Sequence, residues 1–188
     1  MSRVWGTKED VQAYRVIFTF IMEFKGMSEQ DILIKDLPER KVFYLSCKGA
    51  WRQLPEMLAK LSDYLSQSGI KSIGPPSGFY YNTPKDAAVS DLSWEVCYPV
   101  VLDTQAHFDK VAKTGVKRIP ETRAAKIIHE GSYRKTSASY EKLQNWVNTQ
   151  GLKVCGPAEE IYLTDINKTN EDQRIEIQLP VCISDISG

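Results

Sequence analysis

Two glutamates and four aromatic residues form the candidate functional set of this sequence. Glu95 and Glu176 occupy matching places in two similar segments, 94–100 and 175–181. A carboxylate among aromatic faces attracts a cationic or polarised organic molecule by charge pairing and cation–π attraction. Aromatic walls with a few fixed polar groups are also typical of small-molecule pockets. We therefore predict a ligand-binding site made of Glu176, Tyr133, Tyr162, Trp51, Tyr80 and Glu95.

The spacing of these residues predicts the face of a β-sheet on which each lies. In the segment 173–181 three aliphatic residues alternate with Glu176 and its polar neighbour, and the side chains of a strand alternate between two faces. The aliphatic set is expected to pack under helices. The side chain of Glu176 therefore points to the other face of the sheet, as that of Glu95 does in the matching segment. The same alternation assigns Tyr80 and Tyr162 to the face of the glutamates.

Simpler interpretations of these residues stay open. A glutamate on the polar face of a strand is commonly solvated, and the adjacent pair Glu159-Glu160 is interpreted in that way. Trp51 and Tyr133 each follow a glycine turn, where they could form the rims of a cleft or pack a loop onto a helix. Tyrosine also favours strands in general, so Tyr80 and Tyr162 could be ordinary strand residues.

An internal repeat relates the two sets of positions. A shift of 82 residues places Pro38 on Pro120 and Tyr80 on Tyr162, with further glycine and proline matches between them. After a slip of one residue, Glu95 falls on Glu176. A collinear series of this kind indicates a tandem duplication, which is sought before any other pattern because it decides the fold. We place repeat one at 32–101 and repeat two at 116–184.

Each repeat is predicted to be a β-α-β-β unit. The helices have the i, i+3, i+4 spacing of an amphipathic helix and end at Gly69 and Gly151, the residue type that commonly follows a helix. Strands are predicted near 42–47, 77–82 and 93–101, and near 124–129, 159–164 and 173–181. Two such units give an α+β fold with pseudo-two-fold symmetry, with the helices on one sheet face and a ligand groove on the other.

Composition narrows the functions that the chain can have. Its 188 residues include 24 basic and 24 acidic ones, so the formal net charge is zero, which argues against capture of nucleic acid or of an anionic membrane. The four cysteines have no CxxC spacing and there are only two histidines, so no metal and no cofactor are expected. Reduced thiols favour a cytoplasmic protein. Residues 1–31 are predicted to be a helical extension, whose apolar run 16–22 is too short to span a membrane.

Four segments together resemble one known family. They are IKDLPERKV (34–42), HEGSY (129–133), GPAEEIYLTD (156–165) and IEIQLPV (175–181), and they are similar to the gyrase-inhibitor-like (GyrI-like) effector-binding domains across 32–184. The resemblance implies a duplicated fold with a central groove for small organic molecules, often cationic and aromatic. It also implies that Glu176 is the pocket glutamate and that Tyr133 is the aromatic residue after the glycine turn.

The resemblance implies several functions. The leading prediction is a stand-alone binding protein that senses or sequesters a hydrophobic, cationic aromatic ligand. No direct DNA binding is expected, because residues 1–31 are too few for a helix-turn-helix segment. One alternative is a hydrolase that opens the cyclopropane rings of genotoxins with Glu176 as the general base, and product formation would distinguish it. Another is a protein that binds and inhibits DNA gyrase.

Overall fold

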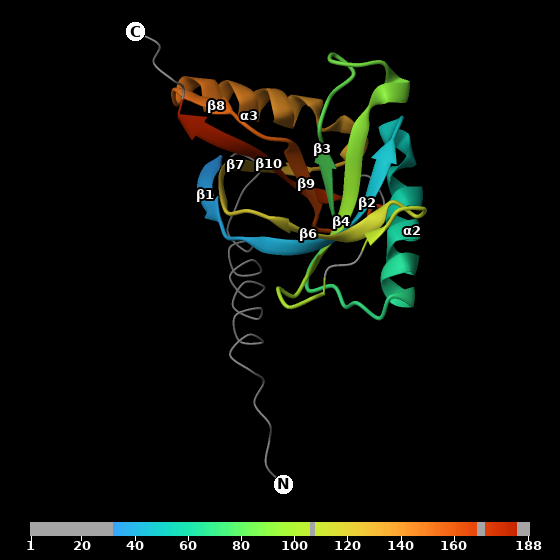
Figure 1. Ribbon diagram of the computed structural model, residues 1–188. Helices are drawn as coiled ribbons and strands as arrows, with labels where there is room; N and C mark the ends of the chain where they lie inside the picture. Colours follow the sequence, from blue (N-terminus) through green and yellow to red (C-terminus); the bar gives the residue numbers. More distant parts are fainter. Residues whose placement is uncertain (1–31, 106–107, 169–171, 184–188) are drawn as a thin grey trace.

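The computed structural model of the chain describes residues 32–105, 108–168 and 172–183. The predicted helical extension 1–31 lies outside these residues. The chain folds into one curved sheet with two long helices on its outer side (Figure 1). The first half contains β1 (Leu33–Leu37), β2 (Arg40–Lys48), α2 (Leu54–Gln67), β3 (Ser77–Tyr80) and β4 (Ser93–Val100). The second half contains β6 (Thr114–Ile119), β7 (Thr122–Glu130), α3 (Ser137–Thr149), β9 (Ala158–Tyr162) and β10 (Arg174–Ile183).

Short elements complete the chain. One-turn 3-10 helices precede the two long helices, at Trp51–Gln53 and Tyr133–Lys135, and a third occupies Val89–Asp91. Two short strands, β5 (Phe108–Asp109) and β8 (Leu152–Val154), pair with β6 and β10. Compared with the predicted β-α-β-β unit, each half has one additional strand at its start, β1 or β6.

The helices end where the glycines predict. Leu54, Leu58 and Leu61 form the buried face of α2, and the chain leaves both helices through Gly69 and Gly151, each with φ of +67°. Residues with a side chain rarely adopt this conformation, whereas glycine adopts it freely. The i, i+3, i+4 spacing and these two stops are therefore confirmed.

The strands form a ten-stranded sheet in the order β1-β7-β10-β9-β3-β4-β2-β6-β5, with β8 beside β10, and all the neighbouring pairs are antiparallel. In the two halves β1 corresponds to β6, β2 to β7, β3 to β9 and β4 to β10. When each strand is replaced by its counterpart and β5 is left aside, the order reads the same from either end. Strands of one half pair with strands of the other at three places, so the two halves share one sheet. Two halves related by a pseudo-two-fold axis are expected to arrange their strands in this order.

The register at the two glutamates agrees with a slip of one residue between the halves. Glu95 lies opposite Ser46 and Phe79, and Glu176 lies opposite Ile128 and Ile161. Positions 46 and 79 correspond to 128 and 161 under the shift of 82 residues. The two glutamates therefore occupy equivalent places in the sheet.

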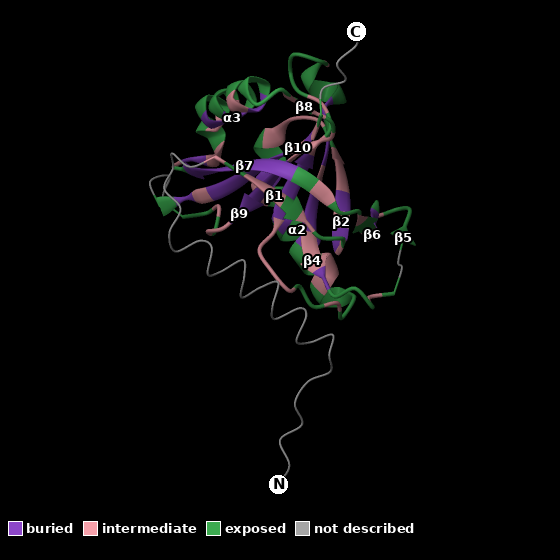
Figure 2. Cartoon of the chain, turned by 90° about the vertical axis from the view of Figure 1, so that its left-hand side faces the viewer, coloured by how far each residue is buried: buried purple, intermediate pink, exposed green. Residues whose placement is uncertain are grey.

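The two faces of the sheet have different partners. Helix α2 packs on β2 and β4, and α3 packs on β7, β8 and β10, so the main core lies between the helices and the sheet. Figure 2 shows the buried strands beneath these helices. On the helix-free face a smaller cluster joins Val42, Phe79 and Cys97. No helix of the described residues is long and apolar enough to cross a membrane.

Truncation of Leu61 tests the main core. Its side chain is fully buried at the centre of α2, so Leu61→Ala should lower the free energy of unfolding by about 2–5 kcal/mol through lost burial and the cavity left behind. Urea denaturation followed by circular dichroism measures the change. The matched control is Asp63→Ala on the exposed face of the same helix, which should change stability by less than about 0.5 kcal/mol. Equal stability of the two variants would contradict the packing described here.

Candidate ligand-binding site

The register separates the predicted site residues into two groups. Tyr80 lies opposite Trp94, and Tyr162 lies opposite Ile175, and all four belong to the core beneath the helices. Glu95 and Glu176 face the other side of the sheet. The prediction that Tyr80 and Tyr162 share the face of the glutamates is therefore wrong. Alternation misplaced them because β3 and β9 are buried on both faces, so an apolar residue does not identify the helix side.

Trp51 and Tyr133 lie with the tyrosines on the helix side. Each begins the 3-10 turn that leads into its helix, and both rings pack against the main core. The Trp51 ring meets Tyr80 edge to face at a centroid distance of 5.1 Å, and Tyr80 stacks on Trp94 at 6.4 Å. The four predicted aromatic residues therefore lie on one face, and the two predicted glutamates on the other.

Both predicted glutamates are already neutralised by lysines of the chain. Glu176 is 1% exposed, and its Oε2 lies 3.2 Å from Lys126 Nζ. Its Oε1 accepts a hydrogen bond from the amide of Gln178. Glu95 forms an ion pair with Lys117 and also accepts a hydrogen bond from the Tyr81 hydroxyl at 2.6 Å. These carboxylates are therefore parts of internal ion pairs.

Lys117 occupies an environment like the one predicted for a cationic ligand. Its ammonium lies 5.1 Å, 5.5 Å and 5.8 Å from the ring centroids of Tyr44, Phe79 and Tyr81. These distances are within the reach of cation–π attraction, about 6 Å. On the helix-free face, the combination of carboxylate and aromatic rings is thus completed by a side chain of the protein itself.

Glu160 is the functional candidate that the sequence interpretation missed. It is 5% exposed and faces the helices, because it lies opposite Gly78 and Ile177. Its carboxylate lies within hydrogen-bonding distance of the hydroxyls of Tyr140 at 3.0 Å, Tyr162 at 3.1 Å and Tyr80 at 3.3 Å. Within the described residues no lysine, arginine or histidine pairs with it. Glu160 is therefore a buried carboxylate held by neutral donors alone.

Burial controls the ionisation of this cluster. Desolvation raises the pKa of Glu160 to about 7, although the three tyrosine hydroxyls act in the opposite direction. Burial also raises the pKa values of Tyr80, Tyr140 and Tyr162 well above their ordinary value, so the phenols stay protonated and can donate. At neutral pH the glutamate is consequently divided between its neutral and its ionised form.

Gly78 leaves the space in which the hydroxyls converge. A Cβ atom at this position would lie 2.8 Å from the Tyr162 hydroxyl, closer than real Cβ contacts, and 3.0 Å from the Tyr80 hydroxyl, tighter than most of them. The two hydroxyls are 2.6 Å apart, and because each has one hydrogen, the one that donates to the other does not donate to Glu160 at the same time. Any side chain on Gly78 would therefore disturb the arrangement around Glu160.

The interpretation of Glu159-Glu160 as a solvated pair is also wrong. Each residue is 5% exposed, and they point to opposite faces of β9. Glu159 pairs with Arg40 on the helix-free face, whereas Glu160 faces the tyrosines. The spacing Tyr80, Glu160 and Tyr162 on two neighbouring central strands is the sequence signal that could have identified this cluster.

Other candidate groups have structural partners. Nε2 of His129 lies 3.1 Å from the Ser132 carbonyl and Nδ1 lies 2.9 Å from the Ser139 hydroxyl, so both ring nitrogens are used. The four cysteines are free. Among the described residues, no group of histidine, cysteine and acidic side chains could hold a metal ion.

Comparison with known families agrees with this fold. The model of the GyrI-like small-molecule-binding domain matches residues 30–181. The chain therefore belongs to the GyrI-like small-molecule-binding domain family. None of the curated proteins matches the chain by sequence.

Solved structures share this fold at low sequence identity. The C-terminal domain of EcmrR is 20% identical, with a TM-score of 0.68 over 82% of this chain and 98% of that domain. A longer EcmrR chain in a complex with DNA gives a TM-score of 0.71 at 18% identity over 94% of this chain, which spans 66% of that chain's length. A hydrolase from Listeria innocua is 15% identical, with a TM-score of 0.61 over 88% of this chain and 98% of that chain.

The raised pKa of Glu160 predicts a pH-dependent stability. A carboxyl group whose pKa is 4.5 in the unfolded chain and about 7 in the folded one stabilises the fold below pH 4.5, and this contribution is lost as the pH rises through 7. Relative to Glu160→Gln, the parent should therefore lose about 2–3 kcal/mol between pH 5 and pH 8. Urea denaturation at several pH values measures this difference.

The control for this measurement is Glu141→Gln, a glutamate exposed on α3. Its stability should follow the parent at each pH. A Glu160→Gln protein whose pH profile is parallel to that of the parent would mean that Glu160 titrates at its ordinary pKa.

Proposed function

We propose that this protein binds a hydrophobic, cationic aromatic molecule at Glu160, and that it senses or sequesters this molecule. The observation that carries the proposal is the absence of a basic partner for Glu160 among the described residues. Glu95, Glu159 and Glu176 each have a lysine or arginine. A ligand cation would supply to Glu160 the charge that those three receive from the protein.

The cost of burying a charge supports this proposal. An isolated carboxylate in an apolar environment is expensive unless it is paired, and it otherwise takes up a proton. In the free protein Glu160 takes up a proton more readily than an exposed glutamate, because burial raises its pKa to about 7. A cation nearby favours the ionised form, so ligand binding and proton release are expected to occur together.

The aromatic rings around Glu160 support the chemical class of the ligand. Trp51, Tyr80 and Trp94 form a continuous set of ring contacts beside the carboxylate, and Tyr80 also donates to Glu160. Each ring face adds about 0.5–2 kcal/mol of attraction for a desolvated cation. A large aromatic cation would satisfy the carboxylate and the rings at the same time.

A structural neighbour suggests a suitable probe. The SAV2435 protein has been solved bound to tetraphenylphosphonium, and it is 16% identical, with a TM-score of 0.50 over 81% of this chain and 94% of that chain. Tetraphenylphosphonium is a hydrophobic cation with four aromatic rings. It therefore represents the proposed ligand class.

Tetraphenylphosphonium should bind more tightly as the pH rises. If the cation requires ionised Glu160, whose pKa is about 7, the affinity should increase about tenfold between pH 6 and pH 8 and then level off. In Glu160→Gln this pH dependence should vanish, and the affinity at pH 8 should fall about ten- to a hundredfold, equivalent to about 1.5–3 kcal/mol. Isothermal titration calorimetry measures both effects.

Two further variants make the experiment specific. Glu141→Gln on the α3 surface should bind like the parent. Glu176→Gln tests the site inferred from the family resemblance: it leaves Lys126 buried without its partner, so it should reduce stability and leave the affinity of the folded protein unchanged. Loss of binding in Glu176→Gln, with normal binding in Glu160→Gln, would move the site to the helix-free face and refute the proposal.

A second candidate function is hydrolysis of a reactive ligand at the same place. A carboxylate whose pKa is about 7 matches the requirement for a general base at neutral pH, and Tyr140 and Tyr162 could orient the reacting group. Glu160 suits this role better than Glu176, which is paired with Lys126. Accumulation of product beyond one equivalent of protein, abolished in Glu160→Gln, would favour the enzyme over the binding protein.

A further inference from the structure

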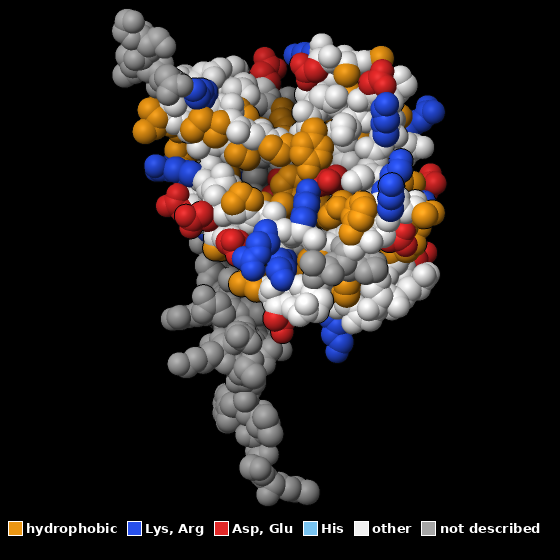
Figure 3. All heavy atoms as spheres, viewed as in Figure 1, with side chains coloured by type: hydrophobic (Ala, Val, Ile, Leu, Met, Phe, Trp, Pro, Cys, Tyr) orange, Lys and Arg blue, Asp and Glu red, His pale blue; other side chains and the backbone are white. Residues whose placement is uncertain are grey.

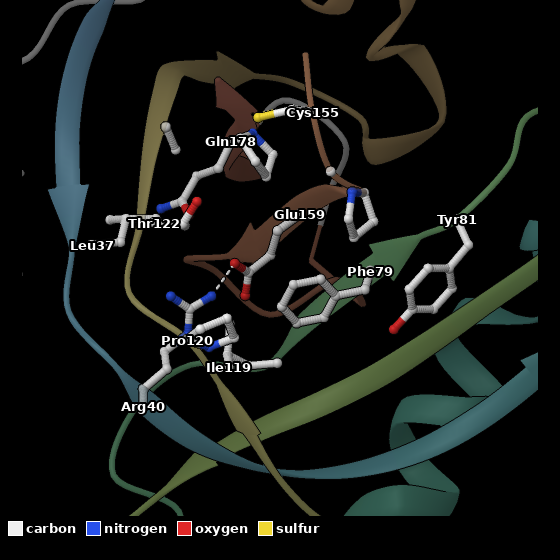
Figure 4. Close-up of a pocket in the computed structure, with 14 residues that line it drawn as sticks. Leu37, Arg40, Phe79, Tyr81, Ile119, Pro120, Thr122, Cys155, Glu159 and Gln178 are labelled. Carbon is white, nitrogen blue, oxygen red and sulfur yellow. Dashed lines mark hydrogen bonds and ion pairs between the residues drawn. The ribbon is translucent and has the colours of Figure 1, made fainter. Parts of the chain in front are cut away.

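A cavity lies on the helix-free face of the sheet. It has a volume of about 270 Å³, close to the lower limit of about 300 Å³ for typical ligand pockets. Side chains from β2, β3, β9 and β10 point into it (Figure 4). Since Glu159 lines this cavity and Glu160 faces the helices, the thickness of the sheet separates it from the site proposed above.

Hydrophobic side chains surround charged ones on this face of the molecule (Figure 3). In the cavity, Phe79, Ile119, Pro157 and Pro180 supply apolar walls. Phe79 contributes a flat ring, and the two prolines come from the chain before β9 and from β10. A flat molecule of modest size fits such walls better than a branched one does.

One buried acceptor in the cavity has no partner. Gln178 is 3% exposed, and its Nε2 donates to Glu176, which determines the orientation of the amide. Its Oε1 accepts no hydrogen bond from the described residues. A buried acceptor without a donor costs about 1–3 kcal/mol. A ligand N–H group that donates to this oxygen would remove that cost.

The charged pair in the cavity supplies donors but no net charge. Arg40 engages Glu159 through Nη2, and a guanidinium has five N–H donors in total, so it can also donate to a ligand carbonyl. Because Glu159 neutralises Arg40, a charged ligand would lack a counter-charge there. An anion would face Glu159, and a cation would face Arg40.

We propose that this cavity is a second ligand site, specific for a neutral planar molecule with an N–H donor beside a carbonyl acceptor. Aromatic carboxamides and lactams are the chemical class. The N–H group donates to Gln178 Oε1, the carbonyl accepts from Arg40, and the ring lies against Phe79. This site does not depend on the function proposed for Glu160, since the two lie on opposite faces of β9.

Three molecules of the same shape test the charge requirement. Benzamide is neutral and has both groups, benzoate is the anion without a donor, and benzamidine is the cation without an acceptor. Titration of the full chain, followed by protein NMR at pH 7.5, should show saturable shifts for Gln178 and its neighbours with benzamide. The dissociation constants for benzoate and benzamidine should be at least tenfold larger.

Gln178→Met tests the orphan acceptor, because it removes the amide and keeps the length of the side chain. Benzamide affinity should fall at least tenfold, whereas tetraphenylphosphonium affinity should be unchanged. Glu160→Gln provides the reciprocal control and should bind benzamide like the parent. If Gln178→Met does not fold, Ile119→Phe serves instead, since it narrows the cavity from its wall and should also abolish benzamide binding.

Several outcomes would overturn the second site. They are equal affinity for the three probes, shifts confined to the residues around Glu160, no saturation at 20 mM benzamide, or unchanged benzamide affinity in the folded Gln178→Met or Ile119→Phe protein. The failure of tetraphenylphosphonium to bind at Glu160 would refute the proposed function alone. Each of the two proposals can therefore be refuted without affecting the other.

Discussion

Burial of the central strands β3 and β9 on both faces is the constraint on which the rest of this structure depends. Helices cover one side of the sheet, and its own curvature encloses the other. Every polar side chain on these strands must therefore find a partner inside the protein, because a buried polar group without one is costly. Glu159 finds Arg40 on one face, and Glu160 finds three tyrosine hydroxyls on the other.

The difference between these two neighbours decides what each face can bind. An arginine neutralises Glu159, so its face presents a balanced pair of charges. Hydroxyl groups stabilise Glu160 without neutralising it, and its pKa rises to about 7. A face with a balanced pair suits a neutral ligand, and a face with an uncompensated carboxylate suits a cation. The two sites that we propose on this strand therefore differ in character.

Much of the fold could be predicted from the sequence because repeats, helix periodicity and terminal glycines are local signals. The shift of 82 residues, the slip before Glu95 and the helix stops at Gly69 and Gly151 agree with the structure. The site was harder to predict, since alternation shows a face only where one side of a strand is exposed. With Phe79 buried on one face and Tyr80 packed on the other, the pattern gave the wrong side for the tyrosines. The sequence does not show that Glu160 is buried, because its partners come from β3, β9 and α3 and only the fold brings them together.

Lys117 provides an internal comparison for the interpretation of Glu160. Its ammonium has a carboxylate, Glu95, and three aromatic rings within cation–π distance. This fold can therefore complete an aromatic and acidic environment with its own cation when the site is structural. Around Glu160 the carboxylate and the rings are present, but within the described residues the cation is missing. A basic side chain on either helix could neutralise such a carboxylate, but only hydroxyl groups reach Glu160 among the described residues. For this reason we propose that a ligand supplies the cation.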